Sequence, residues 1–336
     1  MRISDVARHA GVSPSTVSYV LSGKRSISAA TRERVLESIA VLGYQPHAGA
    51  RALASNRSNV IALVIPLRPG IHVPVAMQFA VSVVTSARDR EHDVLLLTQA
   101  EGEGGLRRVA GTSMVDGIIV MDVEVDDARI PALRALSHPS VLIGVPADTS
   151  GLTCIDLDFE AAGRACVAHL AALGHREVAL IGQPPSVYER RTGFAERTVA
   201  GFEAEARERG VESAVVPCDA GQAAVTATVT ELLRERPRLT GIVVHNEPVL
   251  PTLLEAVRGL GREVPADLSV VAIAPDDLAT EVSPPLTSVS LPAEEVGGRA
   301  VSLLMDKLDA IDPPEVTLLP PRLVPRASAA ARPALF

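Results

Sequence analysis

Tryptophan is absent from this sequence, and aromatic residues make up only 2% of its 336 residues. The three cysteines, Cys154, Cys166 and Cys218, form no C-x-x-C pair, which excludes a disulfide framework and a cysteine zinc site and predicts a reducing compartment. No apolar run reaches the roughly 18 residues that a membrane span needs, and charges from Arg2 onward interrupt the first turns, unlike a secretory signal. We therefore expect a cytoplasmic protein, associated with the nucleoid if it binds DNA, and no membrane partner.

Catalytic motifs are also missing. The sequence contains no H-E-x-x-H, no G-x-S-x-G and no G-x-x-x-x-G-K-[ST]. Its eight histidines show no metal-ligand spacing, and the glycine-rich stretch at 102–105 lacks the lysine of a phosphate-binding loop. We expect no enzyme, no cofactor and no metal site.

The net charge of -8 conceals an asymmetry along the chain. Residues 1–59 contain eight basic and three acidic residues, a net charge of +5, whereas the remainder contains 24 basic and 37 acidic residues, a net charge of -13. A small basic segment on a large acidic body points to an anionic partner for the first segment alone, and nucleic acid is the obvious class.

Apolar spacing within residues 3–43 predicts three short helices. Ser13 and Ser28 are suited to cap the second and third helices, and Pro14 is suited to the first helical position because it has no amide hydrogen to leave unpaired. We expect helices near residues 4–10, 14–21 and 28–42. The expected inward-facing residues are Val6, Ala7, Ala10, Val17, Val20, Leu21, Val35, Leu36 and Ile39.

The first two helices, joined by a short turn with glycine, match the helix-turn-helix, whose second helix enters the major groove. The alternative is a small helical bundle with a solvated basic face. The string ISDVARHAGVSPSTVSYVLSGKRSISAATRERVLESIAVLGYQPHAGARALA strongly resembles the head of the lactose-repressor/galactose-repressor family of bacterial transcription regulators. That resemblance implies sequence-specific binding to double-stranded DNA.

The resemblance also implies roles for single residues. Pro14, Ser15 and Tyr19 match base-reading positions, although proline offers no side-chain donor, so we expect Ser15 and Tyr19 to set the operator preference. The residues that match phosphate-binding positions are Thr16, Ser18, Ser28 and Thr31.

Between head and body, the resemblance makes residues 48–54 a hinge helix in the minor groove at the centre of a near-palindromic operator. Leu53 matches the leucine that wedges between the central base pairs, and Ala50 is small enough for two hinge helices to approach. A helix of about seven residues with Gly49 inside it is unstable alone in water. We expect a linker when free and a helix on DNA.

From Val60 onward, apolar runs alternate with helical stretches, which predicts parallel sheets covered on both faces and an α/β fold class. Helices are expected at 159–173, 193–209 and 293–308. The expected strands are 60–66, 93–99, 116–122, 140–145, 177–182, 241–246 and 269–274. Further motifs, such as C-x-x-D-x-D at 154–158 and V-P-A-D-L-S-V-V at 264–271, resemble the family's core of two periplasmic-binding-protein-like lobes around a ligand cleft.

Several residues are candidates for effector binding. In the family, an arginine before a G-F helix contacts the ligand; Arg190 has the R-x-x-G-F spacing, but we favour Arg197, because a helix from Gly201 to Gly210 matches the family better. Asp276 is the preferred hydroxyl-binding acid, with helix capping as the alternative. Asn246 and Glu247, in place of the family's N-D, are weaker candidates.

The scarcity of rings favours an effector held by Arg and Asp rather than by stacking, although Phe79, Phe159, Tyr188 and Phe194 are available. The family resemblance implies a sugar or sugar derivative by default.

The resulting prediction is an effector-controlled DNA-binding regulator, most simply a repressor, that acts as a homodimer or a tetramer. Its domains are a head at 1–45, a hinge at 46–58 and a two-lobed core at 59–336. The alternatives are a cytoplasmic solute-binding module and a small-metabolite enzyme on the same α/β body; the basic head disfavours the first, and the missing motifs disfavour the second.

Overall fold

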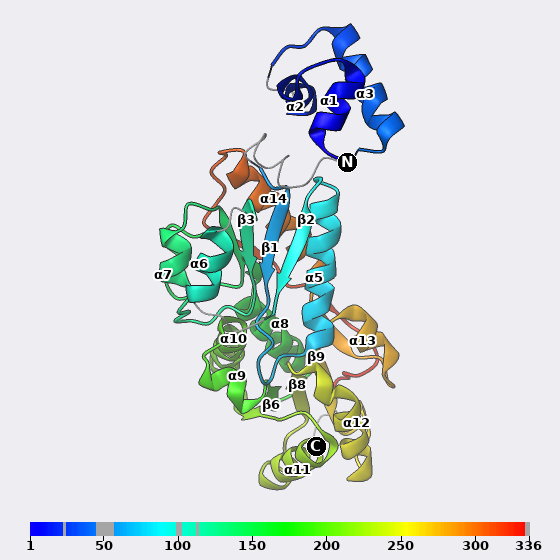
Figure 1. The fold of residues 1–336 in the computed structure, drawn as a ribbon. Helices are drawn as coiled ribbons and strands as arrows, with labels where there is room; N and C mark the ends of the chain where they lie inside the picture. The colour runs from blue at the N-terminus through cyan, green and yellow to red at the C-terminus, as the bar shows by residue number, and fades with distance from the viewer. Residues whose placement is uncertain (23–24, 45–56, 99–102, 112–113, 333–336) are drawn as a thin grey trace.

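The computed structural model describes residues 1–22, 25–44, 57–98, 103–111 and 114–332. Figure 1 shows a small helical head beyond one end of an elongated body that consists of two lobes. Within the described ranges, no helix is both long and apolar enough to cross a membrane. The predicted hinge lies almost entirely outside the described residues, so the domain boundaries around it stay a prediction.

The head contains α1 (Ile3–Ala10), α2 (Pro14–Ser22) and α3 (Ala29–Leu42), as the apolar spacing predicts. Its core is built from the residues expected, with Tyr44 in addition, and from Ile3, Val12, Ile27 and Leu42 at its edge. Two expectations are wrong: Leu21 and Leu36 are exposed. On α3 the inward positions belong to Val35, Ile39 and the small polar Ser38, whose hydroxyl contacts His9 of α1.

The first lobe is built on a six-stranded parallel sheet in the order β11-β5-β4-β3-β1-β2. Its central strands are fully buried, because helices cover both faces. The helices are α5 (Val73–Arg88) and α14 (Ala293–Leu308) on one face, and α6 (Glu103–Gly111) and α7 (Ile130–Ala135) on the other. The strands are β1 (Val60–Val64), β2 (Asp93–Leu97), β3 (Gly117–Val120), β4 (Ser140–Ile143), β5 (Cys154–Leu157) and β11 (Val316–Leu319).

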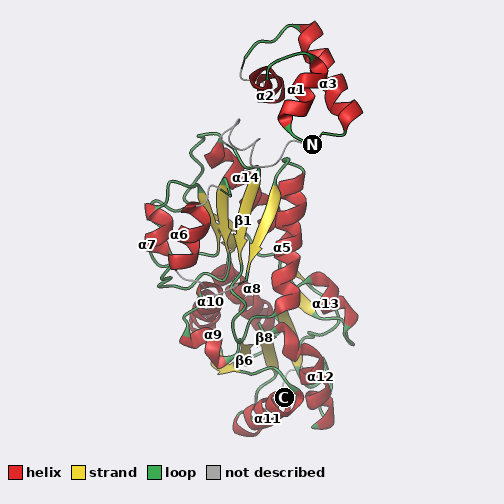
Figure 2. Ribbon diagram, in the orientation of Figure 1, coloured by secondary structure: helices red, strands yellow, loops and turns green. Residues whose placement is uncertain are grey.

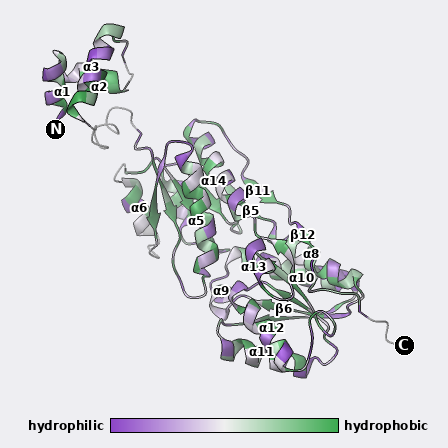
Figure 3. Ribbon diagram, turned by 90° about the vertical axis from the view of Figure 1, so that its right-hand side faces the viewer, coloured by the Kyte–Doolittle hydropathy of each residue, from purple (hydrophilic) through white to green (hydrophobic). Residues whose placement is uncertain are grey.

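The second lobe repeats this architecture with the order β12-β10-β9-β8-β6-β7, in which only the pairing of β12 with β10 is antiparallel among the described strands. The strands are β6 (Glu177–Gly182), β7 (Glu212–Pro217), β8 (Gly241–Val244), β9 (Ser269–Ala274), β10 (Thr287–Ser290) and β12 (Leu323–Val324). The helices are α8 (Phe159–Ala172), α9 (Pro185–Glu189), α10 (Gly193–Arg209), α11 (Gln222–Glu235), α12 (Leu250–Gly259) and α13 (Asp276–Glu281). Figures 2 and 3 show helices on both sides of each sheet and hydrophobic residues along the strands.

Helices α8 and α10 pack closely because glycines remove the side chains at their crossing. A Cβ at Gly201 would lie 1.9 Å from the carbonyl oxygen of Glu160, and one at Gly163 would lie 2.4 Å from that of Thr198. Gly201 therefore lies within α10 and serves this contact, rather than starting a helix.

The chain crosses between the lobes three times: after β5, after β10 and between β11 and β12. Because both sheets are parallel, the loops after their strands meet at these crossings, and ligands of such folds bind at the carboxyl ends of the strands. The seven strands predicted from apolar runs are all present. This architecture confirms the predicted α/β class and the two-lobed core.

Candidate functional site

One face of α2 presents the predicted base-reading residues. Pro14, Ser15 and Tyr19 are exposed, whereas Thr16 and Ser18 are half-buried. The guanidinium of Arg25 lies over the Tyr19 ring, 5.8 Å from its centroid, which places a positive charge beside this ring. The arrangement offers hydroxyl donors and one ring to a partner surface.

Hydroxyl groups surround the N-termini of α2 and α3. Ser13 Oγ accepts from the amide of Thr16 at 3.1 Å, and Ser28 Oγ accepts from the amide of Thr31 at 3.4 Å. Ser28 Oγ also donates to Thr31 Oγ1 at 2.9 Å. Because helix N-termini attract anions, these hydroxyls lie where a phosphate would be held. The hinge candidates Ala50 and Leu53 lie outside the described residues and stay predictions.

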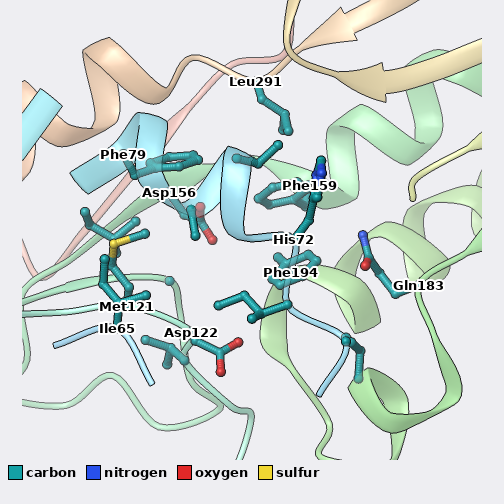
Figure 4. A pocket seen from close by; sticks show the side chains of 18 of the residues that line it. Ile65, His72, Phe79, Met121, Asp122, Asp156, Phe159, Gln183, Phe194 and Leu291 are labelled. Carbon is teal, nitrogen blue, oxygen red and sulfur yellow. The ribbon is translucent and has the colours of Figure 1, made fainter. Parts of the chain in front are cut away.

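A cavity of about 130 Å³ lies between the two lobes (Figure 4). Most of its walls are apolar. The lining residues of the first lobe are Ile65, Gly70, Ile71, His72, Val75, Ala76, Phe79, Met121, Asp122, Val123, Ile143, Gly144 and Asp156. Those of the second lobe and its crossing segments are Phe159, Gln183, Val187, Arg190, Phe194, His245, Glu247 and Leu291.

Aromatic rings meet at the second-lobe side of the cavity. The ring of Phe159 lies 5.5 Å from that of Phe194 and 5.4 Å from that of His245, and Phe194 lies 5.5 Å from His245 at a steep angle. Phe79 contributes a further ring from α5. The fold gathers three of the five phenylalanines at the cavity, while an effector held by Arg and Asp rather than by stacking stays a prediction.

Asp122 and Asp156 are the acidic residues that the first lobe contributes to the cavity lining (Figure 4), and the side chain of Asp122 is almost fully buried. Its backbone is left-handed, with φ 53°, and it is held by Arg129, which donates to the carbonyl oxygens of Met121 at 3.1 Å and Asp122 at 2.8 Å. Arg129 is itself fixed by a buried pair with Asp127 at 2.5 Å. Burial raises the pKa of Asp122, although Arg190 and Arg68 oppose this effect.

Arg190 reaches from the second lobe to the first. Its Nη1 donates to the carbonyl oxygen of Pro69 at 2.8 Å, and its Nε lies 3.7 Å from Glu124 Oε1. In the described part of the chain, seven buried side-chain atoms lack a hydrogen-bond partner. Four of these belong to cavity residues: Arg190 Nε, Asp122 Oδ2, His72 Nδ1 and His245 Nδ1. The cavity thus carries unsatisfied polar atoms that a ligand can pair.

Glu247 is the second-lobe carboxyl in the cavity lining, at the start of the 3-10 helix η1 (Glu247–Val249), and only 5% of the residue is exposed. Burial raises its pKa to about 7 and lowers that of the neighbouring His245 to about 3. His72 of the first lobe lies 3.9 Å away, and burial lowers its pKa as well. Burial therefore disfavours the charged form of both histidines.

Three of the predicted effector residues do not line this cavity. Arg197 does not line the cavity but pairs with the buried lining residue Asp156. Asn246 Nδ2 donates to the carbonyl oxygens of Gly182 at 2.9 Å and Cys218 at 2.7 Å, within the second lobe. Asp276 pairs with Arg326 at 2.6 Å and lines a different groove, beside α5.

The reason for favouring Arg197 was wrong, because α10 begins at Gly193 rather than at Gly201. Gly193 and Phe194 are therefore the pair that opens the helix, and Arg190 precedes them with the R-x-x-G-F spacing. Only Arg190 and Glu247 of the predicted effector residues line the cavity.

Sequence reasoning missed His72, Asp122 and Gln183. Asp122 is the last residue of the strand predicted at 116–122, so its position at the carboxyl end of that strand was a usable signal. His72 and Gln183 carried no such signal, since they lie in loops whose approach depends on how the two lobes meet.

The basic helical head and the two lobes around a ligand-sized cavity define the class of ligand-responsive DNA-binding proteins. Residues 2–47 match the family model "Bacterial regulatory proteins, lacI family", and residues 167–329 match "Periplasmic binding protein-like domain". Catabolite control protein A of Priestia megaterium is 30% identical over 90% of this chain and 91% of its own. The regulator MalR of Streptomyces coelicolor is 32% identical over 99% of this chain and 97% of its own.

Solved structures of regulators are also similar to this chain. The Lac repressor dimer bound to operator and the anti-inducer ONPF is 25% identical, with a TM-score of 0.84 over 98% of this chain and 99% of that chain. The CelR–cellobiose complex is 27% identical, with a TM-score of 0.69 over 98% of this chain and 100% of that chain. This chain belongs to the lacI family: it is a DNA-binding transcriptional regulator with an effector-binding core.

Proposed function

We propose that α2 reads the operator, with Ser15 and Tyr19 in contact with base edges. The hydroxyl-bearing residues predicted to bind phosphates are Thr16, Ser18, Ser28 and Thr31. The observation that carries this assignment is the exposed face of α2 between two hydroxyl-lined helix N-termini. Pro14 lies on the same face and supplies shape and apolar contact only, since it has no side-chain donor. Direct contacts to base edges set sequence preference, whereas phosphate contacts set affinity and register.

The effector binds in the cavity between the lobes, where Arg190, Asp122 and Glu247 are the polar groups that it can contact. This assignment replaces Arg197 and Asp276, because neither residue lines the cavity and both are engaged in ion pairs. Asn246 acts through its hydrogen bonds to the second lobe, which fix the start of the segment that carries Glu247. A sugar is the class that the family resemblance implies, and the cellobiose complex of the CelR relative supports it.

Effector binding controls DNA through the angle between the lobes. Contacts that cross between them include the amide of Gly193 to the carbonyl oxygen of Val123 at 2.9 Å and Arg190 to Pro69. A ligand that meets groups from both lobes changes the free energy of one lobe angle relative to another, by its differential affinity for the two states. The hinge next to the first lobe, with Ala50 and Leu53, transmits the change to the operator centre.

A second copy of this chain completes the regulator, as the near-palindromic operator requires. The exposed apolar face of α5, with Val73, Val81 and Val84, is the surface we assign to that contact. The dimeric state of the related Lac repressor structure supports the assignment. Occupation of the operator makes repression the simplest outcome, at the nucleoid in the cytoplasm.

Head variants test this assignment. Tyr19→Ala should change which half-site is preferred, whereas Thr31→Ala should weaken all sites alike, because a phosphate contact carries no sequence information. Loss of one base contact should cost about 1–3 kcal/mol of discrimination. Binding to a panel of half-site variants, measured by fluorescence anisotropy, checks this. If Tyr19→Ala weakened every site equally, α2 would not read bases through that ring.

A further inference from the structure

Glu247 is a buried carboxyl group without a cationic partner. Among the described residues, no Arg or Lys side chain forms an ion pair with it; the ionisable neighbour that lies 3.9 Å away is His72, whose pKa burial lowers. A buried carboxylate without a partner is costly, which is why its proton is held to about neutral pH. A cationic ligand group would supply the missing partner.

The other two carboxyl groups of the lining have basic partners. Asp156 is compensated by Arg197, and Asp122 lies 3.7 Å from Arg68. Arg190, the one Arg or Lys residue in the described lining, is engaged by Pro69 and lies near Glu124. Although Arg190 Nε lacks a hydrogen-bond partner, its guanidinium lies near the carboxylate of Glu124, whereas Glu247 has no Arg or Lys partner among the described ion pairs. Glu247 is therefore the lining carboxyl group that lacks a charged partner.

The walls favour a cation with an apolar body. Faces of Phe rings attract cations, and Phe159 already carries the guanidinium of Arg197 at 5.7 Å from its centroid. Phe79 and Phe194 complete an aromatic and aliphatic lining that offers few partners to the many hydroxyls of a sugar. A volume of about 130 Å³ is close to that of an engineered cavity, about 150 Å³, which holds one benzene ring.

We propose that the effector is a compact amine with an apolar body of about one ring, whose ammonium group pairs with Glu247. This inference rests on the proposed effector function of the cavity. It separates this chain from a regulator that responds to an oligosaccharide, because the mostly apolar walls offer few partners for the many hydroxyl groups of such a ligand.

Calorimetric titration of the full-length protein with matched probes tests the proposal. Benzylamine and benzyl alcohol share one ring and differ in the head group; benzoate reverses the charge, and glucose and cellobiose represent sugars. At about pH 8 benzylamine should bind at least about tenfold more tightly than benzyl alcohol, since charge-assisted hydrogen bonds are about twice as strong as neutral ones. Benzoate and the sugars should not bind. Equal binding of the amine and the alcohol, or binding of a sugar but not the amine, would overturn the proposal.

Glu247→Gln removes the charge and keeps the shape, and Glu255→Gln, at an exposed position of α12 in the same lobe, is the matched control. The first variant should erase the preference for benzylamine, and the second should keep it. The amine binds the ionised carboxylate, so its affinity for the unaltered protein should fall about tenfold from pH 8 to pH 6 as Glu247 gains its proton, but not for Glu247→Gln. An unchanged preference in Glu247→Gln would contradict the pairing. The probe comparison on the unaltered protein decides the ligand class even if the variant does not fold.

Operator binding separates this inference from the proposed function. If benzylamine binds but leaves operator affinity unchanged, the amine site stands and effector control through the cavity fails. If a sugar binds and shifts operator affinity, effector control stands and the amine inference is overturned.

Discussion

Arg190 and Arg197 lie seven positions apart in the sequence, yet their surroundings assign them different tasks. Arg190 lies in the cavity wall with an unpaired Nε and bridges the lobes. Arg197 faces Asp156, whose pKa burial raises to about 6 in spite of that arginine. One is placed to contact a ligand and the other to hold a buried carboxylate in place.

Alanine at each position should separate these tasks. Arg190→Ala should abolish the effect of a cavity ligand on operator affinity while leaving the free energy of unfolding nearly unchanged. Arg197→Ala should cost about 3–5 kcal/mol of stability, because it leaves a buried carboxylate without its partner. Denaturant unfolding and ligand-dependent operator binding, measured on both variants, check this. A ligand response that survives in Arg190→Ala and disappears in a stably folded Arg197→Ala would restore the choice made from the sequence.

At the scale of elements, helix α5 has one apolar face that packs on the sheet and a second apolar face that is exposed. Its inner face, with Ala76, Ala80 and Val83, packs on the first-lobe sheet, whereas Val81 is 63% exposed and Val84 is 46% exposed. Exposed apolar residues on one helix face are typical of a surface that another molecule covers.

Val81→Asp should therefore convert the dimer to a monomer, because it places a charge in the contact between two α5 helices. Leu260→Asp, at a 43% exposed position after α12, is the matched control and should stay dimeric. Light scattering coupled to size exclusion measures the mass of each variant. A dimeric Val81→Asp would place the interface elsewhere.

The elements that the sequence predicts well are those whose pattern is continuous. Six of the seven predicted strands are apolar runs buried in the two sheets, whereas the seventh, β2, lies at a sheet edge and is only partly buried. The helices at 159–173, 193–209 and 293–308 are present within a residue of the predicted ends. The five strands that were not predicted lack a continuous apolar run. Three of them, β7, β11 and β12, lie at sheet edges and are only partly buried. The other two contain polar residues: β5 contains the buried Asp156, and β10 has the sequence TSVS.

The cavity was harder to predict than the fold. Glu247 and Arg190 were among the candidates because a motif placed them, but His72 and Asp122 come from loops of the other lobe. Their proximity follows from how two lobes meet across three chain crossings, which no local pattern encodes. The start of α10 was misjudged for a related reason, since Gly201 serves the contact with α8 rather than a helix end.

At the scale of the whole molecule, the charge asymmetry and the cavity together support a DNA-binding protein that a small molecule controls. The first 59 residues, head and hinge together, have a net charge of +5 and suit a DNA duplex, while an acidic two-lobed core has a cavity between its lobes that suits a small molecule. Since phosphate contacts release counterions, operator affinity should fall steeply with salt.

The most direct test selects a preferred duplex from random sequences with the intact protein. Its affinity for the selected and a scrambled duplex is then compared at moderate salt, with and without the cavity ligand. The protein should prefer the selected duplex by at least about a thousandfold, and its affinity for that duplex should change when the ligand is added. Equal affinity for both duplexes, with every ligand tried, would contradict this prediction.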